Sequence, residues 1–135
     1  GGMSLLAIVS ASDELVYETT LARVQLQGKQ MVVAQLVLNA ALDMVDEVMW
    51  TTKDRYLKVV DRFNDQLISA YVTAGNYRFV LLHDSRHEEG VQWFFLELHD
   101  LFVKIAMNPL YEHGKPIRSR IFHQRVLNLA SKHLN

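Results

Sequence analysis

The sequence contains no cysteine among its 135 residues. This absence excludes disulfide bonds, thiolate zinc sites and cysteine nucleophiles, and it fits a reducing cytosolic environment. No apolar run reaches the roughly 18 consecutive residues that a membrane-spanning helix needs. The N-terminus also lacks the basic region, apolar run and cleavage site of a signal peptide. We therefore expect a cytoplasmic protein without a membrane span.

Glycine and proline are also scarce, with six and two residues. Gly1 and Gly2 precede Met3, and we interpret this pair as residues left over from cloning. We expect residues 3–135 to form one domain. The other glycines are isolated and form no phosphate-binding loop. Half of the residues are hydrophobic and 21% are charged, which is typical of a globular domain.

Negative charge is missing from the C-terminal region, although the net charge of the chain is only −1. Residues 115–135 contain no acid and five cations: Lys115, Arg118, Arg120, Arg125 and Lys132. These cations form either a solvated helix face or a contact surface for acidic lipid or an acidic partner. Arg118, Arg120 and Arg125 are the candidates for such a contact. Few aromatic residues lie between the cations, which argues against nucleic-acid binding.

The hydrophobic pattern predicts five strands and three helices. The strands are expected at residues 5–9, 15–20, 56–62, 67–73 and 77–83, where β-branched and aromatic residues gather between turns. The first helix is expected at residues 30–50. The second should begin after a cap at Asp84 or Ser85 and end near Asn108–Pro109, and the third should begin after a cap at Ser119. The order ββ-α-βββ-αα predicts an α+β fold with a five-stranded antiparallel sheet. We expect the first helix on one face of the sheet and the other two on the opposite face.

The first predicted helix has an unusually narrow polar stripe. Polar residues recur about every four positions, at Gln35, Asn39, Asp43 and the Asp46–Glu47 pair. Such a helix hides most of its circumference, so it is either sandwiched inside the domain or partly covered by a partner. We interpret Asp43, Asp46 and Glu47 as a solvated or partner-facing stripe rather than a cation site.

The second helix carries more apolar surface than one core stripe uses. Its core stripe consists of Val91, Phe94, Phe95, Leu98, Leu101, Phe102 and Ile105. On its other faces it carries Trp93, Leu96, Val103 and Met107. Either the final helix covers these four residues, or they form a protein-binding patch, because Trp and Met are enriched in interface cores.

No catalytic or metal-binding set is evident. The six histidines are scattered, and His83 and His87 fall at a strand end and in a loop, where they lack helical i, i+4 geometry. The adjacent residues His83, Asp84 and Ser85 cannot form a triad, whose members approach one another from separated chain positions. The sequence therefore predicts a protein that is not an enzyme and has no cofactor or metal.

Several segments resemble the sedlin family. They are residues 39–47 (NAALDMVDE) with Met49 and Trp50, 56–64 (YLKVVDRFN), 70–75 (AYVTAG), 78–79, 82–84, 107–112 (MNPLYE), 116–119 (PIRS) and 132–134 (KHL). The resemblance covers nearly the whole chain from about Ile8 onward, in the family's order. Residues 22–30 depart from it, because this connection is shorter than in vertebrate members. His123 also stands about where relatives have an acidic residue.

The resemblance implies a longin-like, or SNARE-like, fold. It also implies a non-catalytic adaptor of the TRAPP complex, which tethers vesicles between the endoplasmic reticulum and the Golgi and promotes nucleotide exchange on a Rab-family GTPase. Partners would be other TRAPP subunits and, through the complex, the GTPase. Asp43 matches the family's acidic first-helix position and is expected to contact or order a partner. The alternative function is a small-ligand-sensing module.

Overall fold

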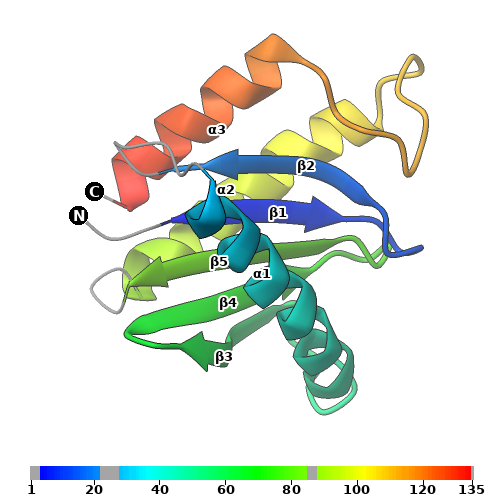
Figure 1. The fold of residues 1–135 in the computed structure, drawn as a ribbon. Helices are drawn as coiled ribbons and strands as arrows, with labels where there is room; N and C mark the ends of the chain where they lie inside the picture. Colours follow the sequence, from blue (N-terminus) through cyan, green and yellow to red (C-terminus); the bar gives the residue numbers. More distant parts are fainter. Residues whose placement is uncertain (1–3, 22–27, 85–87, 135) are drawn as a thin grey trace.

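The structure is a computed structural model that describes residues 4–21, 28–84 and 88–134 (Figure 1). Its elements, in chain order, are β1 (Leu5–Val9), β2 (Leu15–Thr20), α1 (Lys29–Val48), β3 (Tyr56–Phe63), β4 (Gln66–Val72), β5 (Arg78–Asp84), α2 (Glu88–Ala106) and α3 (Arg120–His133). The strands form one antiparallel sheet in the order β2-β1-β5-β4-β3. The predicted ββ-α-βββ-αα order and the longin-like α+β layout are confirmed.

Two helix boundaries bear on the predicted caps. Ser119 accepts a hydrogen bond from the backbone N–H of Phe122 at 3.1 Å, so its predicted role as the cap of α3 is confirmed. Asp84 is the last residue of β5, and the residues between it and α2 lie outside the described ranges, so the predicted cap of α2 stays a prediction. Ser85 lies outside the described residues, as does most of the predicted connection at residues 23–29.

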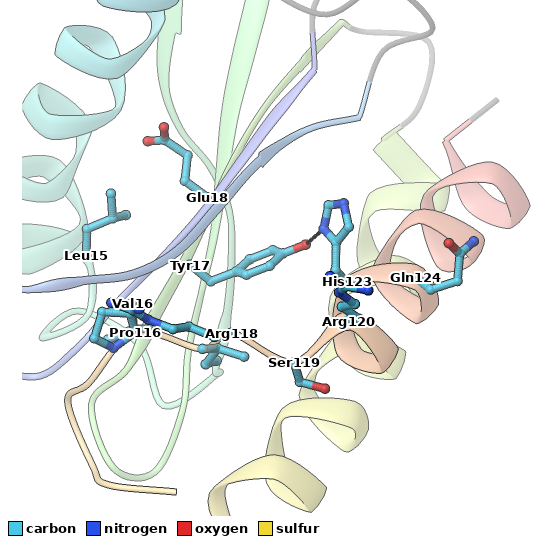
Figure 2. Close-up of a pocket in the computed structure, with 11 residues that line it drawn as sticks. Leu15, Val16, Tyr17, Glu18, Pro116, Arg118, Ser119, Arg120, His123 and Gln124 are labelled. Atoms are coloured by element: carbon cyan, nitrogen blue, oxygen red, sulfur yellow. Dashed lines mark hydrogen bonds between the residues drawn. The ribbon is translucent and has the colours of Figure 1, made fainter.

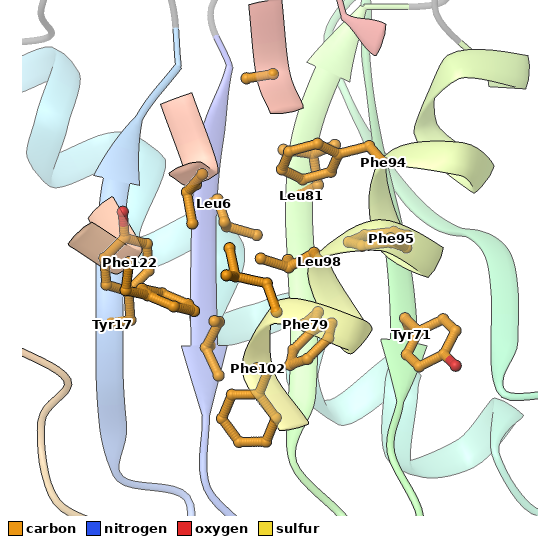
Figure 3. Close-up of a cluster of buried hydrophobic side chains, with 14 of the residues drawn as sticks. Leu6, Tyr17, Tyr71, Phe79, Leu81, Phe94, Phe95, Leu98, Phe102 and Phe122 are labelled. Atoms are coloured by element: carbon orange, nitrogen blue, oxygen red, sulfur yellow. The ribbon is translucent and has the colours of Figure 1, made fainter. Parts of the chain in front are cut away.

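The sheet separates two hydrophobic layers, as predicted. Side chains of a strand alternate between its two faces, so on β5 Phe79 and Leu81 point toward α2 and α3, while Val80 and Leu82 point toward α1. The layer under α2 and α3 is rich in aromatic rings (Figure 3), including Tyr71, Phe79, Phe94, Phe95, Phe102 and Phe122. The layer under α1 contains aliphatic side chains.

The helices α2 and α3 pack closely at one point. A Cβ atom added to Gly90 would lie 2.0 Å from the backbone oxygen of His133, so only glycine allows this approach. Glu97 of α2 binds Lys132 at 3.1 Å and also pairs with His133. These contacts hold the C-terminal end of α3 against the N-terminal half of α2. Within the described ranges, no helix has the length and apolarity needed to cross a membrane.

Candidate protein-interaction surfaces

The outward side of α1 is apolar over its first half. Ala34, Leu38, Ala41 and Val45 face the sheet and are buried, and α1 is therefore not sandwiched inside the domain. The opposite side exposes the apolar residues Val32, Val33, Leu36 and Met44, with Leu36 62% exposed. The predicted alternative in which α1 is sandwiched inside the domain is therefore wrong, and the alternative in which a partner covers part of the helix stays a prediction. We call Val32, Val33, Leu36, Asp43, Met44 and Glu47 the α1 face.

The three predicted acids of α1 lie in two different environments. Asp43 and Glu47 are exposed and continue the row of Val32 and Leu36, because residues about 3.6 apart share one side of a helix. Asp46 lies at the margin of that row, where its Oδ1 is 2.9 Å from Nη2 of Arg78. The buried Arg78 also pairs with Asp13. Asp46 thus ties the end of α1 to the start of β5, whereas Asp43 and Glu47 remain on the outside.

The outward side of α2 carries all four predicted patch residues. Trp93 is 55% exposed, Met107 just beyond the helix is 77% exposed, and Leu96 and Val103 are also exposed. They share one side of the helix, opposite the buried core stripe. We call Trp93, Leu96, Val103 and Met107 the α2 face. Because α3 does not cover these residues, the structure excludes the alternative in which the final helix hides them.

A groove lies between the outer edge of β2 and the start of α3. It has a volume of about 650 Å³ and is lined by Leu15, Val16, Tyr17, Glu18, Pro116, Ile117, Arg118, Ser119, Arg120, His123 and Gln124 (Figure 2). We call it the edge groove. At its floor the hydroxyl of Tyr17 is 2.7 Å from Nδ1 of His123, and burial raises the pKa of Tyr17. Tyr17 therefore keeps its proton and fixes the position of His123.

The predicted basic contact residues lie at or near this groove. Arg118 and Arg120 line it, and Arg125 is exposed one turn further along α3. None of the three forms an ion pair with a carboxylate of the described residues. The carboxylate of Glu18 instead accepts a hydrogen bond from Gln35 of α1 at 2.7 Å, on the other face of the sheet. Among the described residues, Arg118 and Arg120 therefore line the groove without an ion-pair partner, and Glu18 is its one carboxylate.

A second pocket, of about 590 Å³, opens at the end of the sheet near the C-terminal half of α2, and Tyr77, His99 and His113 are among its lining residues. Burial lowers the pKa of His99, and the charge of Arg55 lowers it further. In the described ranges no group of three or more His, Cys, Asp or Glu side chains is placed to hold a metal ion.

Sequence reasoning missed two features of these surfaces. It did not decide whether the apolar α1 residues Val32, Leu36 and Met44 lie inside the domain or under a partner, because a nearly all-apolar helix fits both. It also did not place Tyr17 beside His123, because 106 positions separate them. Only the five cations of residues 115–135, a region without an acid, indicated a surface near α3.

Comparison with known proteins identifies clear relatives. The model of the family described as Sedlin matches residues 8–132. The "Transport protein particle 20 kDa subunit" of Schizosaccharomyces pombe is 36% identical over 131 residues, covering 95% of this chain and 96% of the relative. The "Probable trafficking protein particle complex subunit 2" of Drosophila melanogaster is 35% identical, covering 94% of each chain. The protein of the same name in Caenorhabditis elegans is 45% identical over 97 residues, covering 72% and 69%.

Proposed function

The chain belongs to the sedlin family, and on this premise we propose that it is a non-catalytic adaptor subunit of the TRAPP complex in vesicle tethering and transport between the endoplasmic reticulum and the Golgi. Its direct partners are other TRAPP subunits, as the names of its relatives suggest. It acts at the periphery of endoplasmic reticulum and Golgi membranes through the complex. Rab-family GTPase exchange is a property of the whole complex that this subunit supports.

The observation that carries the proposal is the pair of apolar faces on α1 and α2. They lie on opposite sides of the sheet (Figure 1), so one subunit can contact two neighbours at once. Contiguous exposed apolar surface is uncommon on monomeric proteins and marks interaction sites. A stable contact buries about 800 Å² on each partner.

The described residues also argue against catalysis. Besides the Tyr17–His123 pair, the described residues place the hydroxyl of Ser69 2.8 Å from Nε2 of His83. Both residues are buried between β4 and β5, and Nδ1 of His83 bonds the backbone oxygen of its neighbour Asp84. A substrate cannot reach this pair. Its hydrogen bonds satisfy buried polar groups inside a core.

Two serine substitutions test the adaptor role. We expect Leu36→Ser on the α1 face and Trp93→Ser on the α2 face each to reduce, by tenfold or more, the recovery of a different set of TRAPP subunits with the tagged chain from native extract. Both side chains are exposed, so circular dichroism and the melting temperature of the isolated chain should change little. Ile121→Ser is the matched control, because Ile121 is exposed but lies on neither face.

The acidic half of the α1 face has its own test. Asp43→Lys should weaken the same contact as Leu36→Ser, while Asp65→Lys, at an exposed turn between β3 and β4, should not. Unfolding of the Asp43→Lys chain would instead assign Asp43 a structural role. The proposal as a whole would be overturned if the unsubstituted chain recovered no trafficking proteins, or if all variants recovered them equally.

A further inference from the structure

The two edges of the sheet differ in how they are protected against an added strand. On the outer strand β3, the pairing with β4 shifts register twice, and Lys58 has a positive φ of 65°. Irregular register and charged side chains are common devices that prevent strand addition at an exposed edge. On β2, the pairing with β1 is regular from Tyr17 to Thr20, and its one shift lies at the other end, near Leu15. Among the described residues, β2 is therefore the edge whose regular backbone can accept a further strand.

The register of β2 defines which backbone groups face outward. The N–H of Leu21 bonds the backbone oxygen of Ser4, so Tyr17, Thr19 and Leu21 direct their backbone groups toward β1. Backbone groups of successive residues alternate in direction in an antiparallel pair. The N–H and C=O groups of Glu18 and Thr20 therefore point away from the sheet. They lie at and beyond the edge groove.

The chain itself shows that this edge accepts extended backbone. The N–H of Ile117 donates to the backbone oxygen of Val16 at 2.7 Å, on the outer edge of β2. The outward backbone oxygen of Thr20 accepts a longer hydrogen bond, of 3.3 Å, from the hydroxyl of its neighbour Thr19. The segment then leaves the edge, because Ser119 caps α3. One position of the edge is thus filled by the chain's own backbone, and the positions at Glu18 and Thr20 follow directly after it.

The charge beside the open positions favours an acidic occupant. Arg118 and Arg120 line the groove without a carboxylate partner among the described residues. The first turn of α3 contains no acid. The one carboxylate of β2, that of Glu18, is held on the α1 side of the sheet by Gln35 (Figure 2). A negatively charged segment would compensate both arginines.

We propose that the edge groove binds an extended acidic segment of a partner protein, which adds to β2 as a strand along Glu18 and Thr20 and places carboxylates at Arg118 and Arg120. Main-chain hydrogen bonds to the edge provide affinity in such complexes, and side-chain contacts provide specificity. The proposal rests on the proposed adaptor role in one respect only: it assumes that this chain binds another protein. A lipid surface would use the same arginines but not the backbone of the edge, which is why the observations favour a peptide.

The test uses the isolated full chain and a fluorescent ten-residue peptide that alternates glutamate and valine. A peptide with glutamine in place of glutamate is the matched neutral probe. We expect fluorescence anisotropy to show binding of the acidic peptide, at least tenfold weaker binding by the Arg118→Glu/Arg120→Glu chain, and no binding of the neutral peptide. The distant Arg62→Glu substitution on β3 is the charge control and should reduce binding by less than twofold.

A proline substitution separates strand addition from simple attraction between charges. Thr20→Pro removes an outward N–H without removing a hydrogen bond to β1, because proline is tolerated at an edge where its nitrogen faces solvent. We expect it to weaken peptide binding at least fivefold, whereas Thr20→Val, which keeps the N–H, should not. Circular dichroism checks the fold of both variants.

Each other outcome overturns the proposal. Equal peptide binding by the Thr20→Pro and Thr20→Val chains would leave only an anion site. Binding to vesicles containing phosphatidylserine, without binding of the peptide, would make the groove a membrane contact. Absence of binding to every probe would reject the site. These measurements need no other subunit, so their failure leaves the proposed adaptor role, which is tested in native extract, unaffected.

Discussion

The two faces of the sheet are covered in different ways. Under α1 the buried layer is aliphatic and includes four alanines, Ala34 and Ala41 on the helix and Ala7 and Ala70 on the strands. Under α2 and α3 the layer contains stacked and tilted rings, for example Tyr71 on Phe79 with ring centroids 5.7 Å apart. A single helix can lie close to a sheet only where the side chains between them are small. Two helices with large side chains instead fill a thicker layer.

This difference also explains where apolar surface remains exposed. A lone helix covers its face of the sheet with one row of side chains and leaves its own back exposed, which produces the α1 face. On the other side α3 packs against α2 near Gly90 and Glu97, and this contact leaves Trp93 and Met107 uncovered. Both buried layers are therefore filled with side chains, while α1 and α2 still expose apolar side chains on their outer sides.

Neighbouring residues of β5 give the largest expected difference between the faces. Phe79→Ala should lower the free energy of unfolding by about 3–5 kcal/mol, because it removes a buried ring and leaves a cavity. Val80→Ala, on the α1 side, should cost about 1.5–2 kcal/mol, since about 0.8 kcal/mol is lost for each buried methylene. Urea denaturation measures both. Equal losses would show that the two layers do not differ in packing as described.

The small side chains under α1 give a second, smaller effect. Ala41→Leu should destabilise the chain by about 1–3 kcal/mol, because extra methylenes in a filled core force the helix away from the sheet. Ala40→Leu is the control: Ala40 is exposed one position earlier on the same helix, and a surface substitution usually changes stability by less than about 0.5 kcal/mol. If Ala41→Leu were neutral in thermal unfolding, the close approach of α1 would be refuted.

The smallest expected effect concerns pH and lies in the aromatic layer. His99 packs beside Tyr71 and Phe79, and its lowered pKa, caused first by burial, means that the folded chain resists protonation of His99. The unfolded chain binds this proton more readily, so the stability present above pH ~6.5 decreases as pH falls toward 5. The His99→Gln chain should lose less stability over this range. An identical pH profile for both chains would contradict the assignment.

Acidic conditions add a separate loss at lower pH. The hydrogen bond from His133 and that from Lys132 lower the pKa of Glu97. Its contribution to stability is present above the ordinary carboxyl range and disappears as pH falls through the lowered value. Measurements between pH 5 and 7 therefore report on His99 without this contribution.

Local pattern predicted the fold closely. The β-branched and aromatic residues gathered between turns defined all five strands to within about two residues, because these signals act between near neighbours in the chain. The cap at Ser119 was predicted for the same reason. The pairing of Asp46 with Arg78 was not predicted, because it joins elements that meet only after the sheet has formed.

The candidate surfaces were only half predictable. The periodicity of α2 separated its core stripe from Trp93, Leu96, Val103 and Met107, but it did not indicate whether α3 would cover them. That depends on the position of α3, which the close contact at Gly90 determines. In α1 the apolar residues surround the helix, so periodicity alone did not distinguish Ala41, which faces the sheet, from Leu36, which faces outward.

The absence of cysteine allows a direct test of the central claim that the α1 and α2 faces are docking surfaces. Single cysteines at Leu36, Trp93 and, as a control, Asp65 can each be labelled with a maleimide in the free chain and in the purified native complex. We predict that assembly slows labelling at positions 36 and 93 at least tenfold and leaves position 65 within twofold. Equal labelling rates at positions 36 and 93 in the free and assembled states would contradict the account.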